Sequence, residues 1–318
     1  MRELEFLERM NSDLLALERE LFIEDVAEDF PNIYILGLSR SGTTLAYQVL
    51  CNYLDVRFPN ALVARFWKTP LVGFSLSNIL LGGTKDFNFS SYYGQPTTIF
   101  SPHEYSWFWH RLLRIRDFPI GLKNYLSSDR VDWTHVKQTI ININMATGKA
   151  TVYKPLELIG YRLERYADIL RKSFFVYLER DAVDIACSLA KARIDKFGNL
   201  DCWWGSYPVE YEYLQDSPWD EQIAGQVIYL RNMYEEKFEL IDQSRLLRIG
   251  YSELCGNPNG LLDEVVDRVA DVSGYKLEKV GHPAPFRASK PSVDPRIRRK
   301  LIEALDCFYD RNKGTSDV

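Results

Sequence analysis

The 318-residue chain has little of several features that mark particular classes of protein. Its five cysteines are scattered and include no Cys-x-x-Cys pair, so we expect reduced thiols rather than a disulfide framework. Basic residues do not exceed acidic ones, and the net charge of −5 argues against a general nucleic-acid binder. A local positive pocket for an anionic ligand stays open, because net charge does not report how charges cluster.

Apolar runs long enough to cross a membrane are also missing from the sequence. The longest apolar stretch, residues 71–83, is interrupted by Ser75, Ser77 and Asn78 and is too short to span a bilayer. The first eight residues are broken by charges and lack the apolar region of a secretory signal. We therefore expect a cytoplasmic protein without a transmembrane segment.

A regular alternation of strands and helices is what the sequence does contain. Short apolar runs predict buried strands at residues 32–38, 150–153, 173–178 and 246–249. Helical patterns are predicted at residues 43–54, 156–172 and 181–193, from 259 after a loop at 255–258, and from about 294. This alternation predicts an α/β fold with a central parallel sheet flanked by helices.

Residues 55–149 break the alternation, with many aromatic side chains, several prolines and a pair of glycines. We interpret them as a partly helical insertion that shapes a cleft on a single domain of residues 1–318. Residues 3–23 have the period of an amphipathic helix, which docks on the body or on a second subunit, so a homodimer stays open. Trp107, Trp109, Trp203 and Trp204 either line the cleft or fill the core, and composition favours the core.

The segment between the first strand and its helix has the composition of an anion-binding loop. Backbone N–H groups at the start of a helix converge on one point, where the helix dipole favours negative charge. Arg40 adds a fixed positive charge, and Gly42 lets the backbone approach a ligand closely. Ser41, Thr43 and Thr44 add three hydroxyl groups.

Two other interpretations of this loop were weighed. A Walker A loop requires a lysine where this chain has Thr43, although the spacing from Gly37 to Gly42 fits, so a nucleotide kinase or triphosphatase lacks its phosphate-binding lysine. A capped helix start without any ligand explains one hydroxyl group. It does not explain Arg40 beside three hydroxyls and a glycine.

A second motif lies where the third strand ends. Arg180 follows this strand directly, at the edge where parallel sheets bind ligands, and Ser188 lies eight residues later on the next helix. Taken alone, Arg180 is more simply explained as a surface ion pair with Asp181 or Asp184.

Together the two motifs resemble those of sulfotransferases that use 3′-phosphoadenosine 5′-phosphosulfate (PAPS). Residues 39–45 are similar to their 5′-phosphosulfate loop, and residues 174–188 are similar to their 3′-phosphate motif. The run Tyr251-Ser252-Glu253-Leu254, followed by a proline at 258, resembles a segment common in bacterial and carbohydrate members. The resemblance spans most of residues 32–275 and implies a P-loop-like three-layer fold.

The resemblance also implies roles for individual residues. The 5′-phosphosulfate would be held by Arg40, Ser41, Gly42, Thr43 and Thr44. Arg180 and Ser188 would hold the 3′-phosphate, and no metal is required. Lys154 resembles a lysine near the bridging oxygen, or it is an ordinary lysine at a strand end. The loop 286–290 falls where relatives carry a basic loop over the 3′-phosphate, although its residues match poorly.

Two departures from the family pattern stand out. Ser39 replaces the usual proline of the loop, and Ala182 follows Arg180-Asp181 where proline is frequent. Both changes affect backbone stiffness more than chemistry.

The implied reaction moves the sulfuryl group in line from PAPS to a hydroxyl of a carbohydrate, lipid-linked sugar or small metabolite, and releases 3′-phosphoadenosine 5′-phosphate (PAP). Arg40 and Lys154 suit stabilisation of the leaving oxygen. The general base is open between Glu104, which we favour, His103 and an unidentified group. Glu104 can also be a simple helix-start acid. A non-catalytic nucleotide-binding protein on the same fold stays a third reading beside the enzyme and the kinase.

Overall fold

Four strands form one parallel sheet in the order β2-β1-β3-β4. The computed structural model describes residues 2–82, 85, 89 and 97–313. The strands are β1 (Asn32–Gly37), β2 (Thr151–Tyr153), β3 (Ser173–Glu179) and β4 (Leu246–Gly250). Asn32 of β1 stands opposite Thr151 on one side and Ser173 on the other, so β1 and β3 are the two central strands.

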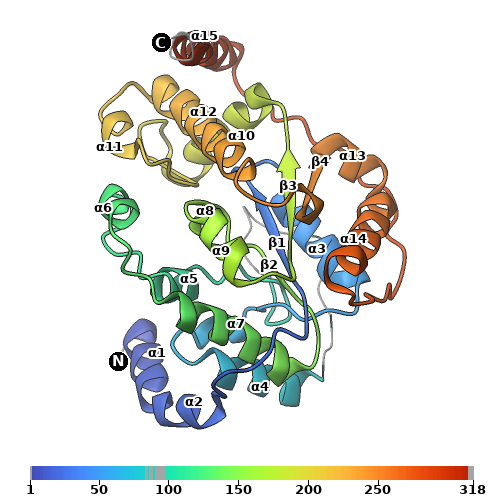
Figure 1. Ribbon diagram of the computed structural model, residues 1–318. Coiled ribbons are helices and arrows are strands. Elements are labelled where there is room, and N and C mark those ends of the chain that lie inside the picture. The colour runs from blue at the N-terminus through green and yellow to red at the C-terminus, as the bar shows by residue number, and fades with distance from the viewer. Residues whose placement is uncertain (1, 83–84, 86–88, 90–96, 314–318) are drawn as a thin grey trace.

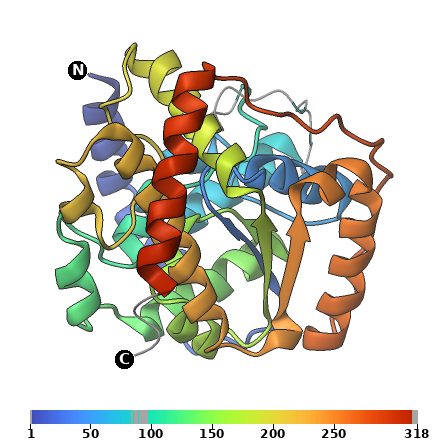
Figure 2. The same cartoon turned by 90° about the horizontal axis from the view of Figure 1, so that it is seen from above.

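Side chains alternate between the two faces of the sheet, and both faces are covered. Along β1, Tyr34 and Leu36 enter one core while Ile33 and Ile35 enter the other. The first core contains residues of α7, α8, α9, α10, α12 and α15, and the second contains residues of α3 and α14. Figure 1 shows these helices on opposite sides of the strands, and Figure 2 shows α15 crossing above the first layer. The predicted three-layer α/β arrangement is confirmed.

The helices of this framework include four that begin within one residue of their predicted starts, at 43, 181, 259 and about 294, and three, at residues 211–214, 219–238 and 251–256, that were not predicted. They are α3 (Thr43–Tyr53), α8 (Glu157–Gly160), α9 (Leu163–Ile169), α10 (Ala182–Phe197), α11 (Tyr211–Leu214), α12 (Trp219–Phe238), α13 (Tyr251–Gly256), α14 (Pro258–Ser273) and α15 (Pro295–Lys313), with a 3-10 turn η2 (Gln243–Arg245). Within the described ranges, no helix is both long and apolar enough to cross a membrane.

Two boundaries differ from the sequence prediction. The single helix expected over residues 156–172 is split into α8 and α9, because Arg162 leaves the helical conformation (φ −133°, ψ 38°) and donates to three carbonyl groups of residues 125–128. The expected loop at residues 255–258 is shorter, because α13 continues to Gly256 and Asn257 alone separates it from α14.

The insertion is helical, as expected, and packs beside the first core. Its elements are η1 (Val63–Arg65), α4 (Pro70–Leu81), α5 (Ser106–Leu112), α6 (Leu122–Ser127) and α7 (Trp133–Thr147). Gly83, one of the glycines noted in the sequence, lies outside the described residues.

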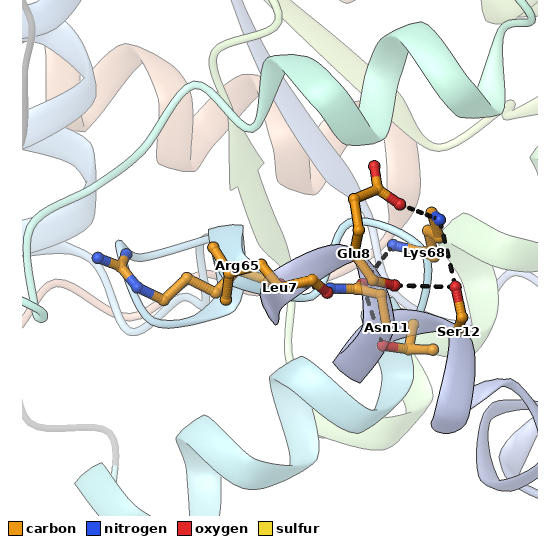
Figure 3. A network of polar contacts seen from close by, with 7 residues as sticks. Leu7, Glu8, Asn11, Ser12, Arg65 and Lys68 are labelled. Carbon is orange, nitrogen blue, oxygen red and sulfur yellow. Dashed lines mark hydrogen bonds and ion pairs between the residues drawn. The ribbon is translucent and has the colours of Figure 1, made fainter. Parts of the chain in front are cut away.

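The N-terminal segment forms two helices, α1 (Glu3–Asp13) and α2 (Leu15–Leu21), that dock on the insertion. Asn11 is fully buried, and its amide donates to the carbonyl of Arg65 and accepts from the backbone N–H of Lys68 (Figure 3). Lys68 also pairs with Glu8. Of the two docking alternatives, the structure therefore shows the body of the same chain.

We expect Asn11→Ala to lower the free energy of unfolding by about 2 kcal/mol, because it leaves the Arg65 carbonyl and the Lys68 N–H without partners. Urea denaturation measures the change. Ser12→Ala on the same helix is the control and should shift stability by less than about 0.5 kcal/mol, since Ser12 is exposed. Equal effects of the two substitutions would contradict the anchoring role of Asn11.

Candidate active site

The strand order reverses between β1 and β3, and this reversal creates the candidate site. In chain order, β2 lies beside β1 on one side and β3 lies beside β1 on the other side. The loops that follow β1 and β3 therefore leave the same edge of the sheet in opposite directions. Ligands of open α/β sheets bind in the crevice at such a point. The two sequence motifs occupy these two loops.

The loop after β1 is held in a conformation that only some residues tolerate. Arg40 (φ +74°) and Gly42 (φ +108°) lie in the left-handed region, and Gly42 is the N-cap of α3. A Cβ atom on Gly42 would stand 2.5 Å from Cδ2 of Tyr251, so the glycine also permits this ring to lie on the loop. Ser41 is fully buried and donates to the Leu38 carbonyl, so its hydroxyl shapes the loop from within.

Arg40 joins the two motifs. Its Nε donates to the Ser188 hydroxyl at 2.9 Å, although the two residues are 148 positions apart. Its backbone carbonyl accepts from Nη1 of Arg180 at 3.0 Å. Its guanidinium carbon also lies 5.9 Å from the centre of the Trp204 ring. Arg40 therefore connects the loop after β1 to Arg180 and to the second turn of α10.

Arg180 faces the loop and makes no ion pair among the described residues. Its Nη2 donates to the Ser289 carbonyl at 2.6 Å, and its guanidinium lies 4.2 Å from the centre of the Tyr251 ring. Its buried Nε has no partner in the described part of the chain. The surface pair with Asp181 is not formed, because the Asp181 carboxylate caps α10 by accepting from Asp184 N–H.

Lys154, at the end of β2, is a buried cation rather than an exposed strand-end lysine. Its side chain is 3% exposed, and Nζ lies 2.6 Å from Oε1 of Glu104 and 3.0 Å from Oγ1 of Thr44. Three predicted site residues from distant parts of the sequence thus meet at one point.

A cavity of roughly 310 Å³ opens over this point. The loop after β1 contributes Arg40, Thr43 and Thr44 to its wall, and the insertion contributes Glu104, Ser106, His110 and Phe118. Leu156–Leu158, Lys196 and residues 204–207 complete the wall. The insertion therefore forms one side of the cleft. A second cavity of roughly 510 Å³ is lined by Arg180, Tyr251 and the ends of β3 and β4.

Residues 204–207 form another part of the cavity wall and are fixed by side chains from several elements. The hydroxyl of Ser39 accepts from Ser206 N–H and lies 2.9 Å from the Ser206 hydroxyl. Gln226 of α12 donates to the carbonyl groups of Trp204 and Ser206. Ser39, the departure from the family's loop proline, thus ties the loop to this wall.

The four tryptophans singled out in the sequence divide between core, cavity and surface: Trp107 is exposed and packs edge-on against Trp67, so for this residue neither expectation holds. Trp204 lines the cavity, whereas Trp109 is fully buried in the core and Trp203 packs on the rings of Tyr207 and Tyr211.

His103 lies beside the site but does not line the cavity. Its Nδ1 accepts from Tyr105 N–H at 2.9 Å, and burial lowers the pKa of the imidazole. As a base it stays a prediction.

Sequence reasoning missed several groups that line the cavity, among them the carboxyl of Glu157. It is 6% exposed, and burial raises its pKa to about 7, with the negative charge of Glu104 acting in the same direction. The available signal was an acidic residue three positions after Lys154 in an otherwise apolar segment.

No family model matches the sequence, and no curated protein shows significant similarity to it. Among solved structures, the sulfotransferase STF1 from Mycobacterium tuberculosis H37Rv is similar with a TM-score of 0.50 and 12% identity, over 93% of this chain and 75% of that chain. The sulfotransferase STF9 from Mycobacterium avium gives 0.47 and 12%, over 93% and 72%. A sulfotransferase domain from the curacin biosynthetic pathway gives 0.44 and 14%, over 86% and 83%.

The chain therefore has the P-loop-like α/β fold of a sulfotransferase. The likeness to STF1 is one of fold, at 12% identity, and the activity has to rest on the site residues of this chain.

We expect Gly42→Ala to lower the free energy of unfolding by about 2 kcal/mol or more, because a Cβ atom there is strained at φ +108° and meets the Tyr251 ring. Denaturant titration measures it. Gly256→Ala is the control, since its Cβ would meet nothing within 4 Å, and it should change stability little. A neutral Gly42→Ala would show that the loop adopts another conformation.

The carboxyl of Glu157 predicts a pH dependence of stability. Because its pKa is about 7 in the folded chain and 4.5 is the ordinary value of a glutamate, the folded state holds the proton more tightly. Its stabilising effect is full below about pH 4.5 and is lost as pH rises to about 7, a loss of about 3 kcal/mol at 1.36 kcal/mol per pKa unit. Unfolding free energies of wild type and Glu157→Gln across this range should therefore diverge, and parallel curves would contradict the shift.

Proposed function

We propose that the protein is a PAPS-dependent sulfotransferase that acts on a hydroxyl group of a carbohydrate, lipid-linked sugar or small metabolite. The observation that carries the proposal is the hydrogen bond from Arg40 to Ser188, with Arg180 bound to the Arg40 carbonyl. This contact unites the two motifs that, in the resembling family, bind the two ends of one nucleotide.

The residues present fit a nucleotide donor that carries anionic groups at two separate positions. Arg40, Thr43 and Thr44 line the cavity at the N-terminus of α3, where the helix dipole favours an anion. Arg180 and Ser188 are assigned to the 3′-phosphate. The buried Nε of Arg180, which lacks a partner among the described residues, is a donor that a phosphate oxygen would satisfy.

In the proposed reaction, an acceptor oxygen forms a bond to sulfur while the bond from sulfur to the 5′-phosphate oxygen breaks. Lys154 and Arg40 place positive charge where negative charge develops on the leaving oxygen. Glu104, paired with Lys154, keeps this lysine oriented and is our sequence candidate for the base. Flat faces on Trp204, Phe118 and Tyr207 suit a sugar ring or another apolar acceptor.

No contact among the described residues specifically favours the two alternatives, a nucleotide kinase or triphosphatase and a non-catalytic nucleotide-binding protein. Thr43 stands where a Walker lysine would reach the terminal phosphates of a triphosphate. A non-catalytic nucleotide-binding protein has no need for a buried lysine–glutamate pair in the cavity.

Calorimetric titration with PAP tests the proposal, with ATP and magnesium as the comparison ligand. We expect PAP to bind wild type and Arg180→Ala to bind it about 10- to 100-fold more weakly, because a charge-assisted contact contributes about 1.5–3 kcal/mol. Arg165→Ala removes the same charge at an exposed ion pair and should bind PAP like wild type.

Absence of PAP binding in folded wild-type protein would overturn the proposal, and tight binding of ATP alone would favour the kinase. Equal losses in Arg180→Ala and Arg165→Ala would show that only total charge matters.

A further inference from the structure

Two carboxyl groups line the cavity, and their surroundings differ sharply. Glu104 is 31% exposed and forms an ion pair with Lys154. Glu157 is 6% exposed and forms no ion pair with any described residue. Pairs of acids held in such unequal environments often divide the two acid–base roles of a reaction.

Backbone geometry directs Glu157 into the cavity. Leu156, between Pro155 and the first residue of α8, has φ +52° and ψ −137°, a strained conformation for a residue with a side chain. One carboxyl oxygen of Glu157, Oε1, accepts from Tyr207 N–H at 3.3 Å. The Ser206 hydroxyl and the Glu157 backbone N–H also interact with this carboxyl and lower its pKa, but Oε2 is buried and makes no hydrogen bond of normal geometry in the described part of the chain. Burying such an oxygen atom costs free energy unless a ligand donates a hydrogen bond to it.

We propose that the Glu157 carboxylate is the general base that takes the proton from the attacking hydroxyl, while Glu104 serves as the counter-ion of Lys154. This inference rests on the proposed sulfotransferase activity. In the step, the acceptor oxygen bonds to sulfur, its proton passes to Oε2 of Glu157, and the electron pair of the broken sulfur–oxygen bond stays on the 5′-phosphate of PAP.

The charges around Glu157 suit this role. Its pKa of about 7 matches a base that must be ionised in part at neutral pH and still hold a proton well. Glu104 faces it from the insertion. Tyr161 at the C-cap of α8, Tyr207, and Tyr234 of α12 also interact with it electrostatically. The other titratable groups that line the same cavity are Arg40, His110, Lys154 and Lys196.

The competing groups are already engaged. If Glu104 accepted the proton, Lys154, with 3% exposure, would lose its counter-ion. His110 packs edge-on against Phe118 at 4.8 Å, and burial lowers the pKa of its imidazole.

The experiment compares Glu157→Gln with Glu104→Gln, two isosteric losses of one carboxylate in one cavity. Release of PAP from PAPS, with water as the acceptor, is followed from pH 5 to 9. We expect the wild-type rate to rise with pH through an apparent pKa near 7. In Glu157→Gln, the rate should fall by at least about 100-fold and its pH dependence should disappear. Glu104→Gln should release PAP more slowly than wild type but with the same pH dependence.

Infrared titration of the free protein gives a readout that does not depend on turnover. The C=O band of a protonated carboxyl should disappear as pH rises through about 7 and should be absent from Glu157→Gln. PAP calorimetry on the same variants separates the assignment of the base from the sulfotransferase proposal, because Glu157→Gln should bind PAP like wild type.

If wild type binds PAP but no such band titrates, or if Glu157→Gln keeps the wild-type rate and pH profile, the assignment of the base is overturned. If PAP fails to bind wild type, the sulfotransferase proposal itself fails. A purely structural role for Glu157 would lower the melting temperature of Glu157→Gln and leave the pH profile in place, and this result would also overturn the inference.

Discussion

A buried cation at the edge of the sheet constrains the rest of the site. Lys154 is 3% exposed, and a lysine in that position is stable only if its charge is balanced and its hydrogens are bonded. Glu104 supplies the charge from the insertion, and Thr44 supplies an oxygen from the first turn of α3. Through Lys154, the ion pair thereby links the insertion to the loop after β1.

The sheet brings the remaining groups to the same place. Because β1 and β3 are adjacent and parallel, Arg40 and Arg180 emerge side by side, and their contacts with Ser188 and the Arg40 carbonyl need no further long-range adjustment. The part of the cavity wall formed by residues 204–207 is held by Ser39 and Gln226. A catalytic arrangement built from ends of rigid elements keeps its geometry better than one carried on free loops.

Much of the fold could be predicted from the sequence, because each buried strand is a continuous apolar run and each motif is local. The loop residues and Arg180 were proposed as site residues for that reason, and their roles stay predictions. The break at Arg162 was missed since it depends on carbonyl groups of another segment, and Glu157 was missed since its environment is created by Leu156 backbone strain and by residues 50 positions away. The partner of Lys154 was likewise invisible, because no spacing rule links residues 104 and 154.

The contacts that Arg180 makes with other described residues are to neutral groups: two carbonyl oxygens and the face of a tyrosine ring. Neutral acceptors fix the position of a guanidinium but do not cancel its charge. The cavity at this edge also contains the carboxylates of Glu179, Asp181, Asp184 and Glu235 beside the cations Arg180 and Arg231. Added salt screens interactions of both signs, so the balance of charge that an anion meets here depends on ionic strength.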